Sequence, residues 1–260
     1  MNPPGVLGQI LEETRARLQR HPVDEHRLEE RAYSCPLGPD AMTSLTRPGI
    51  RIIAEVKRSS PSAGEIRRAA DPVAIAQMYE RAGAAAISVL TEPNHFGGSL
   101  DDLRAVTGAC SLPALRKDFI VSRRQIMEAR VAGASLILLI VAGLTDSELA
   151  ARIQDATDFG LQPLVEAHTA EEVQRALGAG ATLIGVNSRD LISLKVNLSV
   201  AESLRTMIPA GVTAIAESGI GGPDDLARLR AAGFDVFLIG SALMEAEDPA
   251  EALSRMLDVS

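Results

Sequence analysis

The sequence predicts an α/β protein with the architecture of a (βα)8 TIM barrel, a closed parallel sheet ringed by helices. Composition is the first observation: aliphatic residues and Ala dominate, aromatic residues make up only 3%, and Trp is absent. A core of this kind suits an α/β protein better than an antiparallel sandwich. The second observation is a repeated unit, in which a helical segment ends in Ala-Gly or a similar pair and a short apolar run follows. Glycine is the usual residue just past a helix end, and apolar runs without strict alternation are typical of parallel strands covered on both faces.

Eight such runs are expected to form the strands of the barrel. Helix starts lie between them, marked by proline in the first turn after Asp71 and Asp248, by Pro223, and by capping-box patterns at residues 99–102, 145–148 and 169–172. A doubly wound sheet is the second choice, weakened because no Gly-x-Gly-x-x-Gly follows the first run. The expected strands are 51–56, 86–90, 114–116, 136–139, 162–165, 183–186, 214–216 and 236–239.

Residues 1–48 lie outside this repeat and are expected to form a helical extension. Leu7, Ile10, Leu11, Thr14 and Leu18 share one helical face, which predicts an amphipathic helix. We expect the extension to pack on the barrel, with a free arm or an oligomer contact as alternatives. No linker rich in Gly, Ser or Pro interrupts the chain, so residues 1–260 are expected to form a single domain.

Composition also limits the kinds of partner. A net charge of −8 argues against nucleic acid, because there is no basic surplus to neutralise phosphates. Cys35 and Cys110 form no motif, and the four histidines lack metal-ligand spacing, so we expect reduced thiols and no metal site. The N-terminus has no signal-peptide core, and the longest apolar run, 136–142, is too short to span a bilayer. We therefore expect a cytoplasmic protein with no membrane contact.

Polar side chains gather where the expected strands end. Glu55 and Lys57 stand two residues apart, so they share one face of the first strand, where the plain alternative is a structural ion pair. Barrel enzymes work at the C-terminal ends of their strands, so we expect these groups to meet in one mouth. The other polar strand ends are Arg116, Lys117 and Asp118, then Glu166, Asn187, Arg189 and Glu217.

Glycines after the last two strands predict a phosphate site, with simple tight turns as the alternative. Segments 218–221 (SGIG) and 240–242 (GSA) let backbone N–H groups approach an anion, and a short helix from Ser241 would point its positive end there. Two lysines and several carboxylates in the same mouth suit acid–base chemistry on a phosphorylated small molecule. Lysine is a useful acid when neighbours or burial lower its pKa toward neutrality. The residue types alone leave a Schiff-base aldolase open.

At this point the chain resembles the indole-3-glycerol-phosphate synthase family. The motifs that carry the resemblance are 53–62 (IAEVKRSSPS), 88–93 (SVLTEP), 96–99 (FGGS), 115–120 (LRKDFI), 164–166 (LVE), 185–191 (GVNSRDL), 216–220 (AESGI) and 239–244 (IGSALM). The resemblance implies a barrel with a helical segment across its mouth and a carboxy-lyase of tryptophan biosynthesis that needs no cofactor. The implied reaction turns 1-(2-carboxyphenylamino)-1-deoxyribulose 5-phosphate into indole-3-glycerol phosphate, CO₂ and water.

The resemblance also implies residue roles. Lys117 matches the general acid of ring closure, and Glu166 matches the second acid–base residue, which acts in the loss of water. Lys57, paired with Glu55, matches a lysine that assists this dehydration, while Asn187 and Glu217 match groups that orient the intermediate. The implied substrate contacts are Ser60, Pro61 and Ser62 of the first loop, the apolar walls Phe96, Phe119, Leu138 and Leu191, then Arg189 and Ser218, with Lys57, Gly219, Gly240 and Ser241 at the phosphate.

Five positions depart from the family pattern: Ala63, Ser193, Leu194, Asn197 and Glu245. They bear on docking of the first loop and on substrate affinity more than on the reaction. A related phosphate-binding isomerase and a catalytically silent barrel are the remaining alternatives. We expect a monomer or a weak homo-oligomer.

Overall fold

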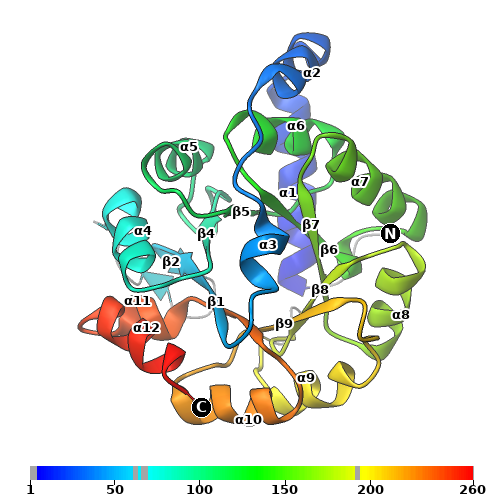
Figure 1. Cartoon of the computed structure of the whole chain (residues 1–260). Helices are drawn as coiled ribbons and strands as arrows, with labels where there is room; N and C mark the ends of the chain where they lie inside the picture. Colours follow the sequence, from blue (N-terminus) through cyan, green and yellow to red (C-terminus); the bar gives the residue numbers. More distant parts are fainter. Residues whose placement is uncertain (1–4, 61–63, 66–69, 191–193, 260) are drawn as a thin grey trace.

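The computed structural model describes residues 5–60, 64–65, 70–190 and 194–259 (Figure 1). Within them, eight parallel strands form a closed barrel in which each strand pairs with its neighbours in chain order, and the last strand pairs with the first. This confirms the predicted fold class. The barrel strands are β1 (Arg51–Val56), β4 (Ala86–Leu90), β5 (Ala114–Lys117), β6 (Leu136–Ile140), β7 (Gln162–Ala167), β8 (Leu183–Asn187), β9 (Thr213–Glu217) and β10 (Val236–Ile239).

Helices cover the outside of the barrel between consecutive strands (Figure 1). Their starts follow the sequence signals: Asp71 and Asp248 are N-caps ahead of proline, and Thr145 forms a capping box with Glu148. These caps satisfy N–H groups that a first helical turn leaves without a partner. The outer helices are α4 (Pro72–Arg81), α5 (Leu100–Ala109), α6 (Arg123–Val131), α7 (Asp146–Asp158), α8 (Ala170–Gly178), α9 (Leu198–Arg205), α10 (Pro223–Ala231), α11 (Ser241–Glu245) and α12 (Pro249–Leu257).

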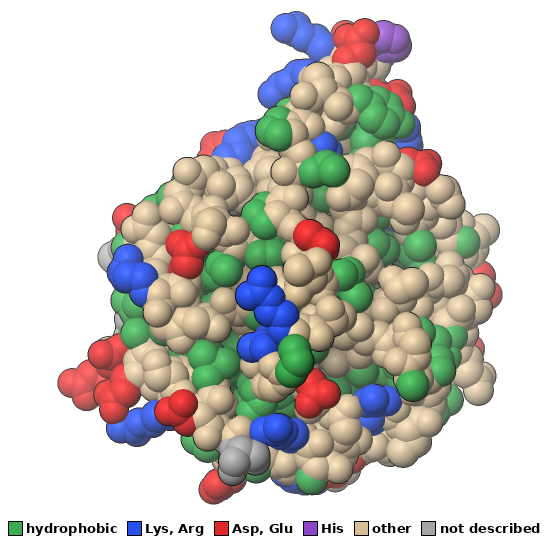
Figure 2. Space-filling model, viewed as in Figure 1, with side chains coloured by type: hydrophobic (Ala, Val, Ile, Leu, Met, Phe, Trp, Pro, Cys, Tyr) green, Lys and Arg blue, Asp and Glu red, His purple; other side chains and the backbone are tan. Residues whose placement is uncertain are grey.

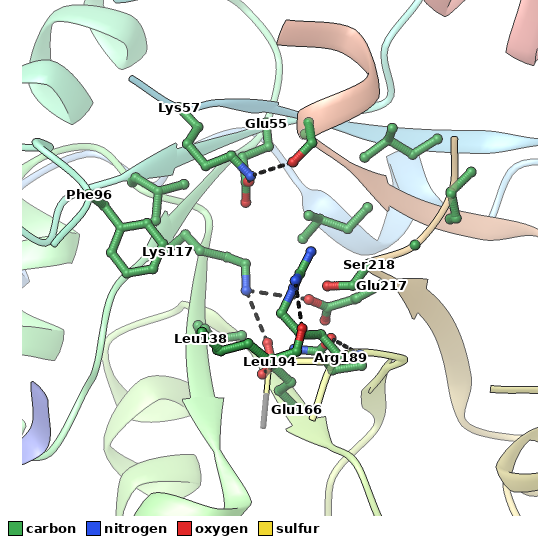
Figure 3. A pocket seen from close by; sticks show the side chains of 18 of the residues that line it. Glu55, Lys57, Phe96, Lys117, Leu138, Glu166, Arg189, Leu194, Glu217 and Ser218 are labelled. Atoms are coloured by element: carbon green, nitrogen blue, oxygen red, sulfur yellow. Dashed lines mark hydrogen bonds and ion pairs between the residues drawn. The ribbon is translucent and has the colours of Figure 1, made fainter. Parts of the chain in front are cut away.

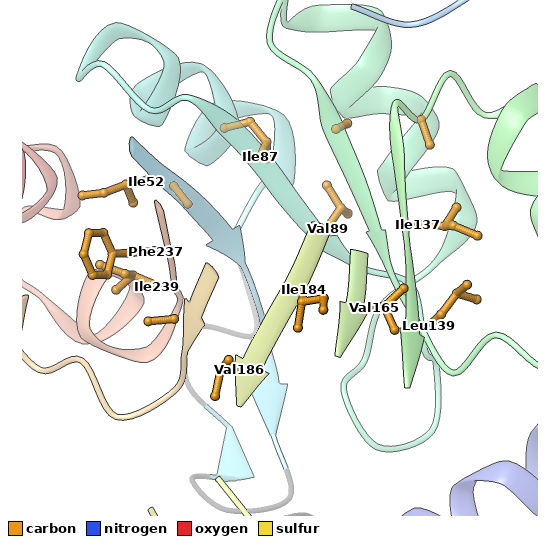
Figure 4. Packing of buried hydrophobic residues seen from close by; sticks show 14 of the residues in the cluster. Ile52, Ile87, Val89, Ile137, Leu139, Val165, Ile184, Val186, Phe237 and Ile239 are labelled. Atoms are coloured by element: carbon orange, nitrogen blue, oxygen red, sulfur yellow. The ribbon is translucent and has the colours of Figure 1, made fainter. Parts of the chain in front are cut away.

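The two-residue alternation of the strands divides their side chains into two buried sets. One set packs between the sheet and the helices and includes Ile52, Val89 and Phe237 (Figure 4). The other set, which includes Ile53 and Leu115, fills the interior of the barrel. A side chain two residues after an interior residue lies on the same face of the strand, nearer its C-terminal end. These later side chains therefore face the mouth of the barrel.

The N-terminal extension contacts both ends of the barrel. Helix α1 (Gly5–Arg20) lies at the mouth, where Leu11 packs against the backbone at Gly143 in the 3₁₀ turn η1 (Val141–Gly143). Helix α2 (Glu25–Ser34) runs beside α6, and α3 (Ala41–Leu45) lies over the opposite end of the barrel (Figure 1). Leu45 packs there with the interior set, at the N-terminal ends of the strands.

Three arginines of α6 hold this extension. Arg124 donates to the carbonyl oxygens of Leu18, at 3.2 Å, and His21, near the end of α1. Arg123 pairs with Glu29 of α2 at 2.6 Å. Arg130 donates to the carbonyl oxygens of Cys35 at 2.6 Å and Pro36 at 2.5 Å. Residues 18–36 of the extension are thus tied to one helix.

Acidic and basic side chains are interspersed on the face in Figure 2, and α2 extends beyond the barrel at the top of the view. Tyr33 and Leu37, in and just after α2, are 59% and 67% exposed. A short antiparallel pair, β2 (Ser59–Ser60) and β3 (Gly64–Glu65), follows β1. Among the described residues, no helix combines the length and the apolarity needed to cross a bilayer.

Candidate active site

A cavity of about 610 Å³ opens at the C-terminal ends of the barrel strands. Charged side chains line its floor, apolar side chains line one wall, and glycine-rich turns line another (Figure 3). Its size and mixed lining are typical of a small-molecule site.

Lys117 is at the centre of the floor. Its Nζ donates to Glu166 Oε2 at 3.0 Å and lies 3.4 Å from Glu217 Oε2 (Figure 3). The three residues come from β5, β7 and β9, and each is the mouth-facing residue near the end of its strand. Both carboxylates are almost fully buried, at 3% and 1% exposed. One ammonium therefore faces two carboxylates in a place of low polarity, where charge interactions are strong.

The three groups shift one another's pKa values. Burial lowers the pKa of Lys117, but the charges of Glu166, Glu217 and Glu55 outweigh burial and raise it. Burial likewise raises the pKa of Glu166, yet the charge of Lys117 and a hydrogen bond from Asn187 bring it below the usual value. Burial and the charge of Glu166 raise the pKa of Glu217 to about 8, against the opposing effect of Lys117. The pKa of Lys117 therefore moves away from neutrality, because three carboxyl groups surround one ammonium.

These directions define the charge state at neutral pH. Lys117 is an ammonium, Glu166 is a carboxylate, and Glu217 retains a proton. Glu217 Oε1 is buried without a hydrogen-bond partner among the described residues. A lysine held as an ammonium is a proton donor rather than an amine nucleophile, which disfavours the Schiff-base alternative.

A second charged pair lies at the C-terminal end of β1, where Glu55 is in the strand and Lys57 directly follows it. Lys57 Nζ is 3.1 Å from Glu55 Oε1 and donates to Ser241 Oγ, also at 3.1 Å. The pair was predicted to share one face of the strand, and both side chains line the cavity (Figure 3). Lys57 therefore lies between the charged floor and the start of α11.

Two glycines make room for the carboxyl groups of Glu217 and Glu55. A Cβ at Gly185 of β8 would overlap Glu217 Oε1, and one at Gly240 would overlap Glu55 Oε1. For Gly185 the strand register brings this about, since Gly185 pairs with Ile215, two residues before Glu217. The sequence analysis assigned Gly240 to phosphate binding and did not single out Gly185 for any role.

Asn187 joins the floor to the following loop. Its Nδ2 donates to Glu166 Oε1 at 2.9 Å, and its Oδ1 accepts the Arg189 backbone N–H at 2.9 Å. The Arg189 side chain donates to the Leu194 carbonyl at 3.0 Å and lines the cavity. Leu194 has a φ of 59°, which is uncommon for a residue with a branched side chain.

Apolar groups line the wall beside Lys117. Phe96 and Phe119 have ring centroids 6.1 Å apart, and Leu138 lines the same cavity. Helix α1 adds Val6, Leu7 and Ile10 to the same cavity. The sequence analysis expected this helical face to pack on the barrel and did not assign it to the site.

The turns after β9 and β10 line the opposite side. Ser218 and Gly219 both have positive φ, 62° and 81°, so the chain turns sharply after Glu217. Ser241 begins α11, next to Gly240. The N–H of Gly221, which the glycine-rich segment offered as an anion ligand, donates instead to Asp225 Oδ2 at 2.8 Å.

Most of the predicted site residues come together around this cavity. Arg116 does not, because it lies on the opposite face of β5 from Lys117 and pairs with Asp118 at 2.9 Å. Pro61, Ser62 and Leu191 lie outside the described residues, as do the departures Ala63 and Ser193, and of Ser60 only the backbone is described. The predicted residues that line the cavity are Glu55, Lys57, Phe96, Lys117, Phe119, Leu138, Glu166, Asn187, Arg189, Glu217, Ser218, Gly219, Gly240 and Ser241.

The arrangement suits proton transfer beside a flat apolar surface. It combines a charged proton donor, one carboxyl group with a lowered pKa, one with a raised pKa, and room for an aromatic ring. Over the described ranges, no group of three His, Cys, Asp or Glu side chains is placed to hold a metal ion.

Comparisons with known proteins point to one family. The family model described as indole-3-glycerol phosphate synthase matches residues 8–256. The indole-3-glycerol phosphate synthase of Streptomyces griseus is 47% identical over 256 residues, covering 97% of this chain and 94% of that protein. The enzyme of the same name from Mycobacterium avium is 45% identical over 259 residues, covering 99% and 95%.

Solved structures with low identity share the fold alone. A 3-hexulose-6-phosphate synthase aligns with a TM-score of 0.64 at 17% identity, covering 81% of this chain and 99% of that one. A thiamine phosphate pyrophosphorylase from Pyrococcus furiosus aligns with a TM-score of 0.61, also at 17% identity, covering 83% and 95%.

Proposed function

The chain belongs to the indole-3-glycerol phosphate synthase family, and we propose that the cavity at its barrel mouth is the active site for the reaction of that family. The chain is a carboxy-lyase of tryptophan biosynthesis that acts on a phosphorylated small molecule. Its substrate is 1-(2-carboxyphenylamino)-1-deoxyribulose 5-phosphate, and its products are indole-3-glycerol phosphate, CO₂ and water. The observation that carries the site assignment is Lys117, held between Glu166 and Glu217 next to an apolar wall.

Lys117 is the proposed general acid for ring closure. As the aromatic carbon that bears the carboxylate attacks the ketone carbon, the ketone oxygen gains negative charge and needs a proton. The raised pKa of Lys117 keeps its proton in place until that oxygen develops charge nearby. Loss of CO₂ then restores the aromatic ring.

Glu166 and Lys57 are the proposed acid–base groups for the loss of water. This step needs a proton on the departing hydroxyl and removal of a proton from the adjacent carbon. Glu166 is available as a base because its pKa is lowered, while Glu55 and Ser241 hold the Lys57 ammonium at the other side of the cavity. Asn187 and Glu217 are proposed to orient the intermediate by hydrogen bonds to its hydroxyls.

The substrate is proposed to lie across the cavity from one wall to the other. Its aromatic ring would pack between Phe96, Phe119 and Leu138, which holds the ring flat over the ketone. Its phosphate would lie at Gly219, Gly240 and Ser241, with charge supplied by Lys57 and with Ser218 as a further substrate contact. Arg189 is proposed to contact the carboxylate, and Ser60, Pro61, Ser62 and Leu191 are proposed to complete the contacts.

Indole fluorescence tests the function directly. The purified chain should convert the substrate to a fluorescent indole product, and Glu166→Gln should lower kcat by about a hundredfold, a typical effect for a positioned acid–base group. Glu251→Gln is the matched control, since it makes the same chemical change on the exposed side of α12 and should leave the rate unchanged. Absence of turnover in the parent chain would overturn the proposal.

We further propose that residues 1–260 act as one domain, as a monomer or weak homo-oligomer in the cytoplasm. The contacts of α6 with residues 18–36 support one domain, because they tie the extension to the barrel. Sedimentation at micromolar concentration tests the oligomeric state, and a stable higher assembly would contradict it.

A further inference from the structure

Glu92 is a buried carboxylate that the reaction does not use. It follows Thr91 just past the end of β4, and it is only 2% exposed. Its two oxygens accept three consecutive backbone N–H groups: Oε1 accepts from Asn94 at 3.0 Å, and Oε2 accepts from His95 at 2.6 Å and Phe96 at 3.2 Å. No cation of the described residues pairs with it. Burying a carboxylate in this way is costly unless hydrogen bonds compensate, and here backbone N–H groups do so.

The two ends of this turn have anchors of their own. The Thr91 N–H donates to the carbonyl of Lys117 at 3.1 Å, and its hydroxyl donates to Asp118 Oδ2 at 2.7 Å. At the other end, Gly98 packs so tightly that a Cβ there would overlap the Leu90 carbonyl. With both ends fixed, Glu92 controls the path of the turn between them.

Helix α1 holds the outside of the same turn. His95 Nε2 lies 2.8 Å from Glu13 Oε2, and Gln9 donates to the same Glu13 side chain at 2.8 Å. His95 is therefore held on its backbone by Glu92 and on its ring by α1. The next residue, Phe96, points into the cavity (Figure 3).

Phe96 is the part of the turn that bears on the reaction. Its ring is tilted by 38° to that of Phe119, which follows the proposed acid Lys117 by two residues. Glu92 accepts the backbone N–H of Phe96. A rotation of the turn that broke this hydrogen bond would therefore also move the Phe96 ring away from the wall.

We propose that Glu92 is a positioning residue that sets the Phe96 wall of the cavity through its hydrogen bonds to the turn. This inference rests on the proposed function for its kinetic consequence, though not for its structural one. Glu92 touches no substrate atom; it acts through Phe96. A Gln at this position offers one acceptor oxygen where the turn needs two, and its amide N–H groups face backbone N–H groups. An Asp keeps both acceptors on a shorter side chain.

A fluorescent probe tests the structural part without any turnover. The chain contains no Trp, so Phe96→Trp introduces a single indole side chain at the wall. Adding Glu92→Gln should shift its emission to longer wavelength and raise its acrylamide quenching constant at least about twofold, because the ring loses its packed position. Glu148→Gln is the matched control: that carboxylate also accepts a backbone N–H, from Thr145 at 2.8 Å, on a helix away from Phe96. Identical spectra with and without Glu92→Gln would overturn the proposal.

A double-mutant cycle tests the kinetic part. Glu92→Gln should lower kcat/KM about tenfold, Glu92→Asp should recover part of that loss, and Glu148→Gln should have no effect. In a Phe96→Leu background, Glu92→Gln should cost little more, which corresponds to a coupling of about 1.4 kcal/mol for a tenfold effect. Full additivity would show that Glu92 does not act through Phe96. An inactive parent would instead overturn the proposed function, and the fluorescent probe would still decide the role of Glu92.

Discussion

Lys117 Nζ lies 3.4 Å from Glu217 Oε2 across the barrel, and Glu217 is the member of this pair with the unusual charge state, since it retains its proton at neutral pH. Burial and the neighbouring Glu166 raise the pKa of Glu217 to about 8, although Lys117 opposes the shift. Two buried carboxylates beside one ammonium would carry a net negative charge if both were ionised. Retaining one proton avoids that charge, and it makes the floor of the cavity sensitive to pH.

The stability of the protein should therefore depend on Glu217. Its pKa is higher in the folded state than the usual value of 4.5, so the folded state binds more protons than the unfolded state between about pH 4.5 and 8. Over this window its contribution to the free energy of unfolding falls as pH rises, by up to about 1.4 kcal/mol per pH unit. Glu217→Gln should remove this slope. Urea unfolding of parent and variant between pH 5 and 9 measures it, and parallel curves would contradict the assignment.

Gly185 should resist substitution, because its missing side chain leaves room for Glu217. Gly185→Ala places a Cβ on top of Glu217 Oε1, so the carboxyl must move away from Lys117. We expect kcat to fall by about tenfold or more and the protein to lose roughly 1–3 kcal/mol of stability, as overpacking typically costs.

Gly178→Ala is the control, since a Cβ at Gly178, in helix α8, meets nothing within 4 Å. It should leave activity unchanged and preserve or raise the melting temperature. Equal kinetics for the two alanine variants would contradict the role given to Gly185.

The negative charge of Glu245 should weaken binding of the phosphorylated substrate by repelling its phosphate. Glu245 lines the cavity at the end of α11, on the side proposed for the phosphate, and it is exposed. Removing its negative charge with Glu245→Gln should lower KM about two- to threefold, with kcat unchanged, since the charge acts across solvent. The gain should shrink as salt is added, because screening weakens it. A KM ratio that does not change between 20 and 500 mM salt would contradict an electrostatic cause.

The sequence predicted the barrel and the order of its strands because glycine stops and apolar runs recur with each unit. It placed the strand ends too early. The expected strands 114–116, 162–165, 183–186 and 214–216 stop before Lys117, Glu166, Asn187 and Glu217, all of which belong to strands in the structure. The prediction ended these strands near the first polar residues after each apolar run, whereas the hydrogen-bond ladder continues into the polar mouth.

Other features depended on tertiary contacts that no local pattern encodes. The raised pKa of Lys117 results from carboxylates on β1, β7 and β9 that converge only when the barrel closes. The path of the N-terminal extension also depends on tertiary contacts. Helix α3 has only five residues, and it is stabilised by packing against the end of the barrel opposite the mouth. The sequence does carry a signal for Gly185, because a glycine inside an apolar strand often marks a place where another group approaches the backbone closely.

Release of CO₂ from carboxyl-labelled substrate in a single turnover tests the central claim most directly, because it reports ring closure separately from the later loss of water. With Lys117 as the acid for ring closure, Lys117→Ala should release CO₂ at least about a hundredfold more slowly than the parent chain. CO₂ release at the parent rate in Lys117→Ala, whatever happens to indole formation, would contradict it.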